Sequence, residues 1–116
     1  MPALTTARLI LDDEPVAQVE QARSLAERSR GLLGRDGIGT GLVLQPASSV
    51  HTLGMRFAID VAYVDRSGTV LAVTTMPPRR MGRPRLRSKW ILETEAGRCA
   101  EWGITPGRVL RLEPGE

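Results

Sequence analysis

The chain has 116 residues, which is enough for one domain with a buried core, and we predict a single domain over residues 1–116. Its one cysteine, Cys99, excludes an intramolecular disulfide and favours a reducing compartment. Residues 1–15 lack the long apolar stretch of a signal peptide, and no segment approaches the roughly 18 apolar residues that a spanning helix needs. We therefore expect a cytoplasmic monomer without a membrane partner.

The net charge of +3 originates in one short segment. Residues 1–78 carry seven basic and eight acidic side chains, and residues 90–116 carry three and five. Residues 79–89, here called the basic segment, hold six cations and no acid: Arg79, Arg80, Arg83, Arg85, Arg87 and Lys89. These side chains are candidate anion-binding residues, since guanidinium groups bind oxyanions through two hydrogen bonds. Because breakers interrupt the segment and its cations repel one another, we expect a mobile loop.

In chain order, the apolar pattern first predicts strands over 7–11 and 16–19, joined by an acidic, proline-containing turn over 12–15. A capping box from Ser24 to Glu27 then predicts a helix over 25–33. A four-residue loop with glycine at residues 65–68 predicts a hairpin. The remaining predicted elements are strands over 41–44, 50–53, 59–64, 69–75, 90–93 and 109–112, and a second helix over 96–102.

Seven or eight short strands with two short helices predict a mainly β fold, a compact single-domain β-sandwich or barrel. The strands follow one another too closely for βαβ crossovers, which argues against a doubly wound sheet. The predicted core consists of apolar residues in these elements: Leu44, Val50, Ile59, Val61, Val64, Val70, Leu71, Val73, Ile91, Ile104 and Leu110.

The stretch from His51 to Asp60 is the candidate functional site. Its polar side chains stand inside apolar sequence, where they are costly unless they have partners. His51 is the only histidine, and histidine is the side chain whose charge normally changes near neutral pH. Cys99 has no histidine close to it in the sequence, and we interpret it as a buried small hydrophobe. The scattered acids, one histidine and one cysteine form no dense ligand set, so we expect no metal and no cofactor.

Five motifs, in the same order and spacing, give the chain a resemblance to a known family. They include a Gly-Leu-Leu-Gly-Arg helix end, the His-Thr-Leu-Gly-Met segment and an Asp-x-x-Gly hairpin, and they occupy residues 31–35, 51–55, 58–60, 65–68 and 96–107. Over residues 24–112 the chain resembles the family called domain of unknown function 192. The resemblance implies a small β-rich domain of sandwich type and a family with no established reaction.

The chain departs from the family pattern at three positions. Gly54 replaces a bulky aromatic residue, Arg56 replaces a frequent asparagine, and Ala58 replaces a frequent proline. If the family's cleft uses the aromatic residue as a wall, the cleft is more open in this protein.

The polar positions shared with the family have no obvious common reason to coexist other than a site. We therefore expect them to line one partly exposed ligand-binding cleft around the HTLGM segment: Arg35, His51, Thr52, Met55 and Asp60. Arg35 beside Asp60 would neutralise a charge that burial makes expensive.

Three functional hypotheses follow. The first is a non-catalytic module that binds a small ligand or a partner protein in the HTLGM cleft, with the basic segment steering anions. The second is a small enzyme with His51 as general base and Asp60 as the group that orients it. The third is a weak polyanion or nucleic-acid binder acting through the basic segment. The first is favoured, because one histidine and one carboxylate without a nucleophile or metal leave most reactions unassisted.

Overall fold

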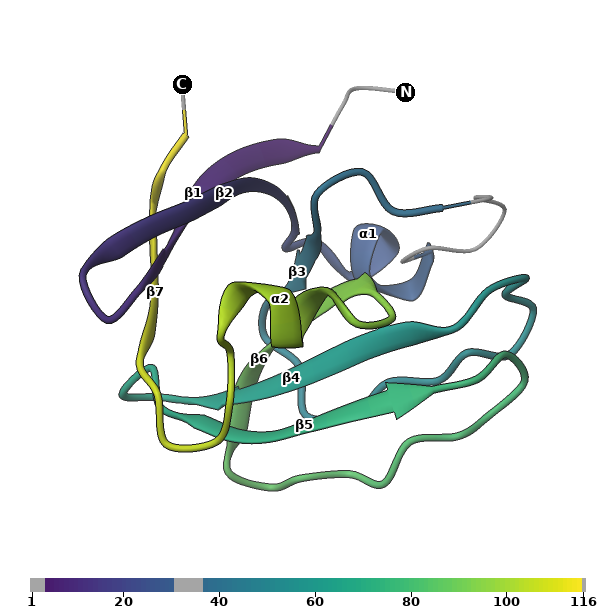
Figure 1. Cartoon of the computed structure of the whole chain (residues 1–116). Helices are drawn as coiled ribbons and strands as arrows, with labels where there is room; N and C mark the ends of the chain where they lie inside the picture. The colour runs from purple at the N-terminus through teal and green to yellow at the C-terminus, as the bar shows by residue number, and fades with distance from the viewer. Residues whose placement is uncertain (1–3, 31–36, 116) are drawn as a thin grey trace.

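The computed structural model describes residues 4–30 and 37–115, in which seven strands form one sheet in the order β5-β4-β6-β3-β2-β1-β7 (Figure 1). The elements are β1 (Thr5–Leu11), β2 (Glu14–Ala22), α1 (Leu25–Arg30), β3 (Leu42–Leu44), β4 (Ile59–Asp65), β5 (Val70–Met76), β6 (Ser88–Glu95), α2 (Arg98–Trp102) and β7 (Leu110–Pro114). The predicted class, a mainly β single domain with two short helices, is confirmed.

The sheet curls until its two outer strands meet at one end. Thr69 and Val109, which directly precede β5 and β7, form an isolated antiparallel bridge. The Leu110 amide donates to the Gly68 carbonyl at 2.8 Å. Gly68 permits this approach, because a Cβ there would lie 2.5 Å from the Leu110 oxygen. Beyond this contact β7, yellow in Figure 1, runs away from β4 and β5, so the result is a barrel that stays open on one side.

The connection from β2 to β3 corrects the sequence prediction. The two strands pair in parallel, with Glu20 opposite Leu42, and α1 lies in the connection between them. A βαβ crossover therefore occurs once, whereas the other strand pairs among the described residues are antiparallel. The capping box that begins α1 is confirmed: the Glu27 amide donates to Ser24 Oγ, and the Ser24 amide donates to Glu27 Oε1, both at 3.1 Å.

Two local predictions change in the structure. The β1–β2 turn consists of Asp12 and Asp13 alone, both with positive φ, so the predicted turn over 12–15 was too long. The predicted strand over 50–53 is absent, and His51 forms only a single bridge with Met81. The predicted β4–β5 hairpin is confirmed, and there Asp65 Oδ1 accepts from the Thr69 amide at 2.9 Å. Among the described residues, no helix is long and apolar enough to cross a bilayer.

The core has two clusters, one on each face of the central strands. Successive residues of β4 alternate between them, with Ala62 and Val64 in the first cluster and Ile59, Val61 and Tyr63 in the second. Of the predicted core residues, eight are buried: Leu44, Ile59, Val61, Val64, Val70, Ile91, Ile104 and Leu110. Val50, Leu71 and Val73 are half-buried and pack against the clusters. β4 and β6 are buried along most of their length, which explains the apolar runs at residues 61–64 and 90–92.

Candidate functional site

Thr52 ties the HTLGM segment to the start of the basic segment. Its side chain is 0% exposed, and its hydroxyl donates to the Pro77 carbonyl at 2.7 Å and accepts from the Arg80 amide at 2.8 Å. The Thr52 amide donates to the Arg80 carbonyl at 2.8 Å, and its carbonyl accepts from the Arg79 amide at 2.9 Å. Every polar group of Thr52 therefore has a protein partner, so the residue fixes two segments against each other and has no group to spare for a ligand.

Met55 and Asp60 face opposite sides of the sheet. Met55 packs into the second core cluster with Ile59, while Asp60 follows Ile59 on β4 and so points to the other face. There the Asp60 carboxylate meets α2, through hydrogen bonds to the Gly97 amide (2.9 Å) and the Cys99 amide (3.2 Å). The cleft expected to contain both Met55 and Asp60 is therefore not formed.

Asp60 acts on α2 in the manner of an N-cap supplied by a neighbouring strand. Its Oδ2 accepts the amides of Gly97 and Cys99, which begin the helix, and its Oδ1 accepts the Thr75 hydroxyl at 2.7 Å. The N-cap residue of α2 itself cannot supply a capping side chain, because it is Gly97. A carboxylate that is 3% exposed is thus satisfied by three donors.

His51 lies at the surface, opposite Met81 of the basic segment. The structure thus brings His51 and Thr52 to the basic segment, and leaves Asp60 on the far side of β4. Arg35 and the family motif over 31–35 lie outside the described residues. The ligand-binding role of these five residues stays a prediction, without the shared cleft that motivated it.

Cys99 is buried in α2, where its sulfur lies 3.7 Å from the Thr94 hydroxyl. The pKa of the thiol is raised to about 11, mainly by burial; the contact with Thr94 lowers it and the charge of Asp60 raises it, and both effects are included in that value. At neutral pH Cys99 therefore carries its proton and lacks the thiolate that a nucleophile or metal ligand needs. Among the described residues, no group of three or more His, Cys, Asp or Glu side chains is placed to hold a metal ion.

The basic segment is held by a series of backbone hydrogen bonds, which the sequence did not predict. The Gly82 amide donates to Val50, the Arg85 amide to Ser48, and Ala47 donates to Lys89, at 2.8 to 2.9 Å. Gly82 is required for this close approach, because a Cβ there would lie 2.5 Å from the Val50 oxygen. We call residues 47–52 and 79–89 together the basic ladder. These hydrogen bonds hold the basic segment against residues 47–52 without forming a regular strand, and its mobility stays a prediction.

Among the described residues, the cations of the basic ladder form no ion pair, although the charge of Arg87 acts on Asp65 and helps to lower the pKa of that carboxyl. Arg79, Arg80, Arg83, Arg87 and Lys89 are exposed, and none forms an ion pair with a described residue. In the sequence, no acid occurs over residues 37–59 or 66–92, so pairing of these stretches concentrates positive charge. Arg85 differs from these exposed side chains, because its guanidinium lies 4.7 Å from the centroid of the buried Tyr63 ring.

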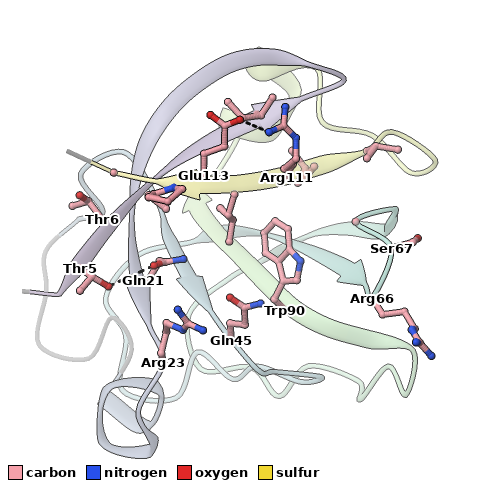
Figure 2. A pocket seen from close by; sticks show the side chains of 18 of the residues that line it. Thr5, Thr6, Gln21, Arg23, Gln45, Arg66, Ser67, Trp90, Arg111 and Glu113 are labelled. Atoms are coloured by element: carbon pink, nitrogen blue, oxygen red, sulfur yellow. Dashed lines mark hydrogen bonds and ion pairs between the residues drawn. The ribbon is translucent and has the colours of Figure 1, made fainter.

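A groove on the open side of the barrel is the feature that sequence reasoning missed. It encloses about 1190 Å³ between β7 and Trp90 of β6, with the β4–β5 turn at one end (Figure 2). The residues that contribute to its lining include half-buried Leu4, Leu112, Gln45 and Gln21, and the exposed Arg23 that directly follows β2. These residues come from distant parts of the chain and form no motif, so only the closure of the sheet reveals the site.

In this groove the acidic side chains form ion pairs, whereas two of the arginines form none with described residues. Its acids are paired: Asp12 with Arg108, Asp13 with Arg111, and Glu113 with Arg8 and Arg111. Arg23 and Arg66, which flank Trp90 in Figure 2, form no ion pair with a described residue. The groove therefore offers two cations to a ligand, together with the half-buried apolar side chains of Leu4 and Leu112.

Comparison with known proteins agrees with this description. The family model DUF192, described as an uncharacterised ACR, matches residues 8–112. The chain belongs to the DUF192 family. The match begins earlier than residue 24, because it includes the β1–β2 hairpin that the motif-based resemblance left out. No curated protein matches the chain.

Two solved structures share the DUF192 fold seen here. A protein of unknown function from Novosphingobium aromaticivorans DSM 12444 has a TM-score of 0.76 at 20% identity, covering 93% of this chain and 84% of its own. A proposed transcription regulator from Sinorhizobium meliloti 1021 has a TM-score of 0.81 at 18% identity, covering 97% of both chains. At these identities the comparison establishes the fold alone.

Proposed function

We propose that this DUF192 protein is a non-catalytic binding module whose groove between β7 and Trp90 takes a small organic anion. The observation that carries the proposal is that Arg23 and Arg66 form no ion pair with a described residue, at a groove whose acids are all paired with arginines. A charged ligand group would gain charge-assisted hydrogen bonds from them, and its apolar part would cover Leu112 and Leu4.

This proposal keeps the binding role expected from sequence and moves it away from the HTLGM segment. The reason is that the polar groups of Thr52 already form hydrogen bonds with Pro77, Arg79 and Arg80, and that Met55 is buried in the core. The enzyme hypothesis is the weaker one, because the Asp60 oxygens that were to orient His51 accept from Thr75, Gly97 and Cys99 instead.

The anionic fluorophore 8-anilinonaphthalene-1-sulfonate is a suitable probe of the groove. We expect one molecule to bind per chain, and the double variant Arg23→Ala/Arg66→Ala to bind about tenfold more weakly, through loss of charge-assisted hydrogen bonds. The variant Arg80→Ala/Arg83→Ala removes the same charge from the basic ladder and should bind the probe normally. Backbone NMR shifts on titration should map to β1, β7 and Trp90. Shifts centred on residues 51–55 would instead restore the HTLGM segment as the site.

A second candidate function, polyanion binding, rests on the basic ladder. Its exposed cations form no ion pair with a described residue, and its backbone is hydrogen-bonded to residues 47–52, so association need not order a free loop. A solved relative in fold is described as a proposed transcription regulator, which is compatible with such a role.

Polyanion binding can be measured by titrating the protein with a duplex DNA fragment at increasing salt. We expect weak binding that falls steeply with salt and has little sequence preference. The variant Arg80→Ser/Arg83→Ser should lower the salt slope by about 2, one for each lost phosphate contact. Arg8→Ser/Arg111→Ser removes the same net charge elsewhere and serves as control. An affinity for DNA that does not change with salt concentration would rule out this electrostatic function.

A further inference from the structure

Strongly exposed apolar side chains gather on the same part of the molecule as the unpaired positive charge. Among residues 4–30 and 37–115, the large hydrophobic side chains with the greatest exposure are Leu53 (45%), Met81 (72%), Leu86 (91%) and Val109 (44%). Three of these four belong to the basic ladder or, in the case of Leu53, directly follow it. A surface that served only to stay soluble would not concentrate its apolar side chains in its most basic part.

The backbone of the basic ladder displays two of these side chains outward. The Ser88 amide donates to the Arg85 carbonyl at 2.9 Å, which places Leu86 and Arg87 at the two central positions of a tight turn. Met81 is paired across the ladder with His51, and both side chains are exposed. Exposed apolar side chains, Met81 and Leu86, thus alternate with cations along a segment whose backbone is hydrogen-bonded to the rest of the protein without a partner.

We propose that the basic ladder docks on the surface of an anionic lipid bilayer. The cations, including Arg80, Arg83 and Arg87, lie among the negative headgroups, while Leu86 and Met81 reach the boundary with the acyl chains. Each basic residue near such a surface adds to the attraction, and each apolar tip that leaves water adds a second, salt-independent contribution. The inference rests on the second proposed function, polyanion binding, and names its partner.

The apolar tips distinguish a bilayer from a nucleic acid. A phosphate backbone accounts for the arginines, but it offers little apolar surface to Leu86 at 91% exposure. The surface of an anionic bilayer offers negative charge to the arginines and an apolar boundary to Leu86. Binding to it does not require a concave site on the protein. Binding of this kind requires no spanning helix, because the protein stays outside the hydrocarbon core.

Cosedimentation with vesicles tests the inference. At low salt, we expect the full chain to bind vesicles that contain phosphatidylglycerol and not to bind vesicles of phosphatidylcholine alone. Arg80→Ser/Arg83→Ser should weaken binding roughly 30-fold, and Arg8→Ser/Arg111→Ser should leave it nearly unchanged. Leu86→Ser should weaken vesicle binding roughly fivefold and leave binding to duplex DNA unaltered. Equal melting temperatures will show that these surface variants fold normally.

Three results would overturn the inference. Binding to duplex DNA without binding to anionic vesicles would leave polyanion binding in place and remove the bilayer as partner. Vesicle binding that Leu86→Ser and Met81→Ser do not weaken would show that the apolar tips have no part in docking. If the protein binds neither DNA nor vesicles, the second proposed function fails together with this inference.

Discussion

Replacing Asp60 by alanine should lower the free energy of unfolding by about 3 kcal/mol, because the buried Cys99 amide loses its acceptor and the start of α2 loses a negative charge. The carboxylate is 3% exposed and accepts from the Thr75 hydroxyl and from the amides of Gly97 and Cys99. The Cys99 amide is within the protein and has no access to replacement water, whereas Thr75 is exposed and does. Urea denaturation of the two proteins at pH 7 measures the difference.

Asp60→Asn is the matched control for this experiment. The asparagine oxygen can accept from Gly97 and Cys99, and its amide can donate to the Thr75 hydroxyl, so each position keeps a partner. We expect the asparagine variant to lose much less stability than the alanine variant. Equal losses would mean that the negative charge at the start of α2, and not the hydrogen bonding, supplies the stabilisation. Retention of full stability by Asp60→Ala would contradict the capping role.

Replacing Thr52 by valine should cost about 2 kcal/mol of stability with almost no change in side-chain shape. Valine leaves the Pro77 carbonyl and the Arg80 amide without the hydroxyl that each now contacts, at 2.7 and 2.8 Å. The side chain is 0% exposed, so water cannot take the place of the hydroxyl without a rearrangement. Thermal and chemical denaturation give the stability change.

Hydrogen exchange locates the effect of Thr52→Val. Amides of the basic ladder, including those of Arg80 and Gly82, should exchange faster, while amides of β1 and β2 should keep their protection. Thr52→Ser retains the hydroxyl and should preserve the ladder, at the smaller cost of one buried methyl group. A valine variant as stable as the unmodified protein, together with a less stable serine variant, would show that Thr52 acts through packing.

Local sequence signals predicted the elements whose interactions lie close together in the chain. The capping box at Ser24 and Glu27 depends on neighbouring residues, and so does the Asp65–Gly68 turn of the β4–β5 hairpin. Both are present as predicted. The predicted strand over 50–53 was wrong, because its apolar pattern comes from Val50 packing on the second cluster and from the ladder contacts of Thr52, and neither requires a strand.

The sequence also identified residues with unusual demands and could not say what would meet them. Thr52 and Asp60 are buried polar side chains in apolar surroundings, and both needed partners as expected. The partners are Pro77 and Arg80 for one and Thr75, Gly97 and Cys99 for the other. A burial cost can be inferred from a pattern of residues, but whether a ligand or the protein meets it depends on distant segments.

The sequence by itself determined the mainly β class, the two short helices, the family resemblance and the concentration of charge in residues 79–89, because these follow from local periodicity, motifs and composition. The tertiary structure alone decided three further matters: Asp60 and Met55 lie on opposite faces of β4, the basic segment pairs with residues 47–52, and a groove opens where β7 leaves β5. Each depends on strand register and on the curl of the sheet. Those are set by contacts between residues far apart in the chain, which no local pattern encodes.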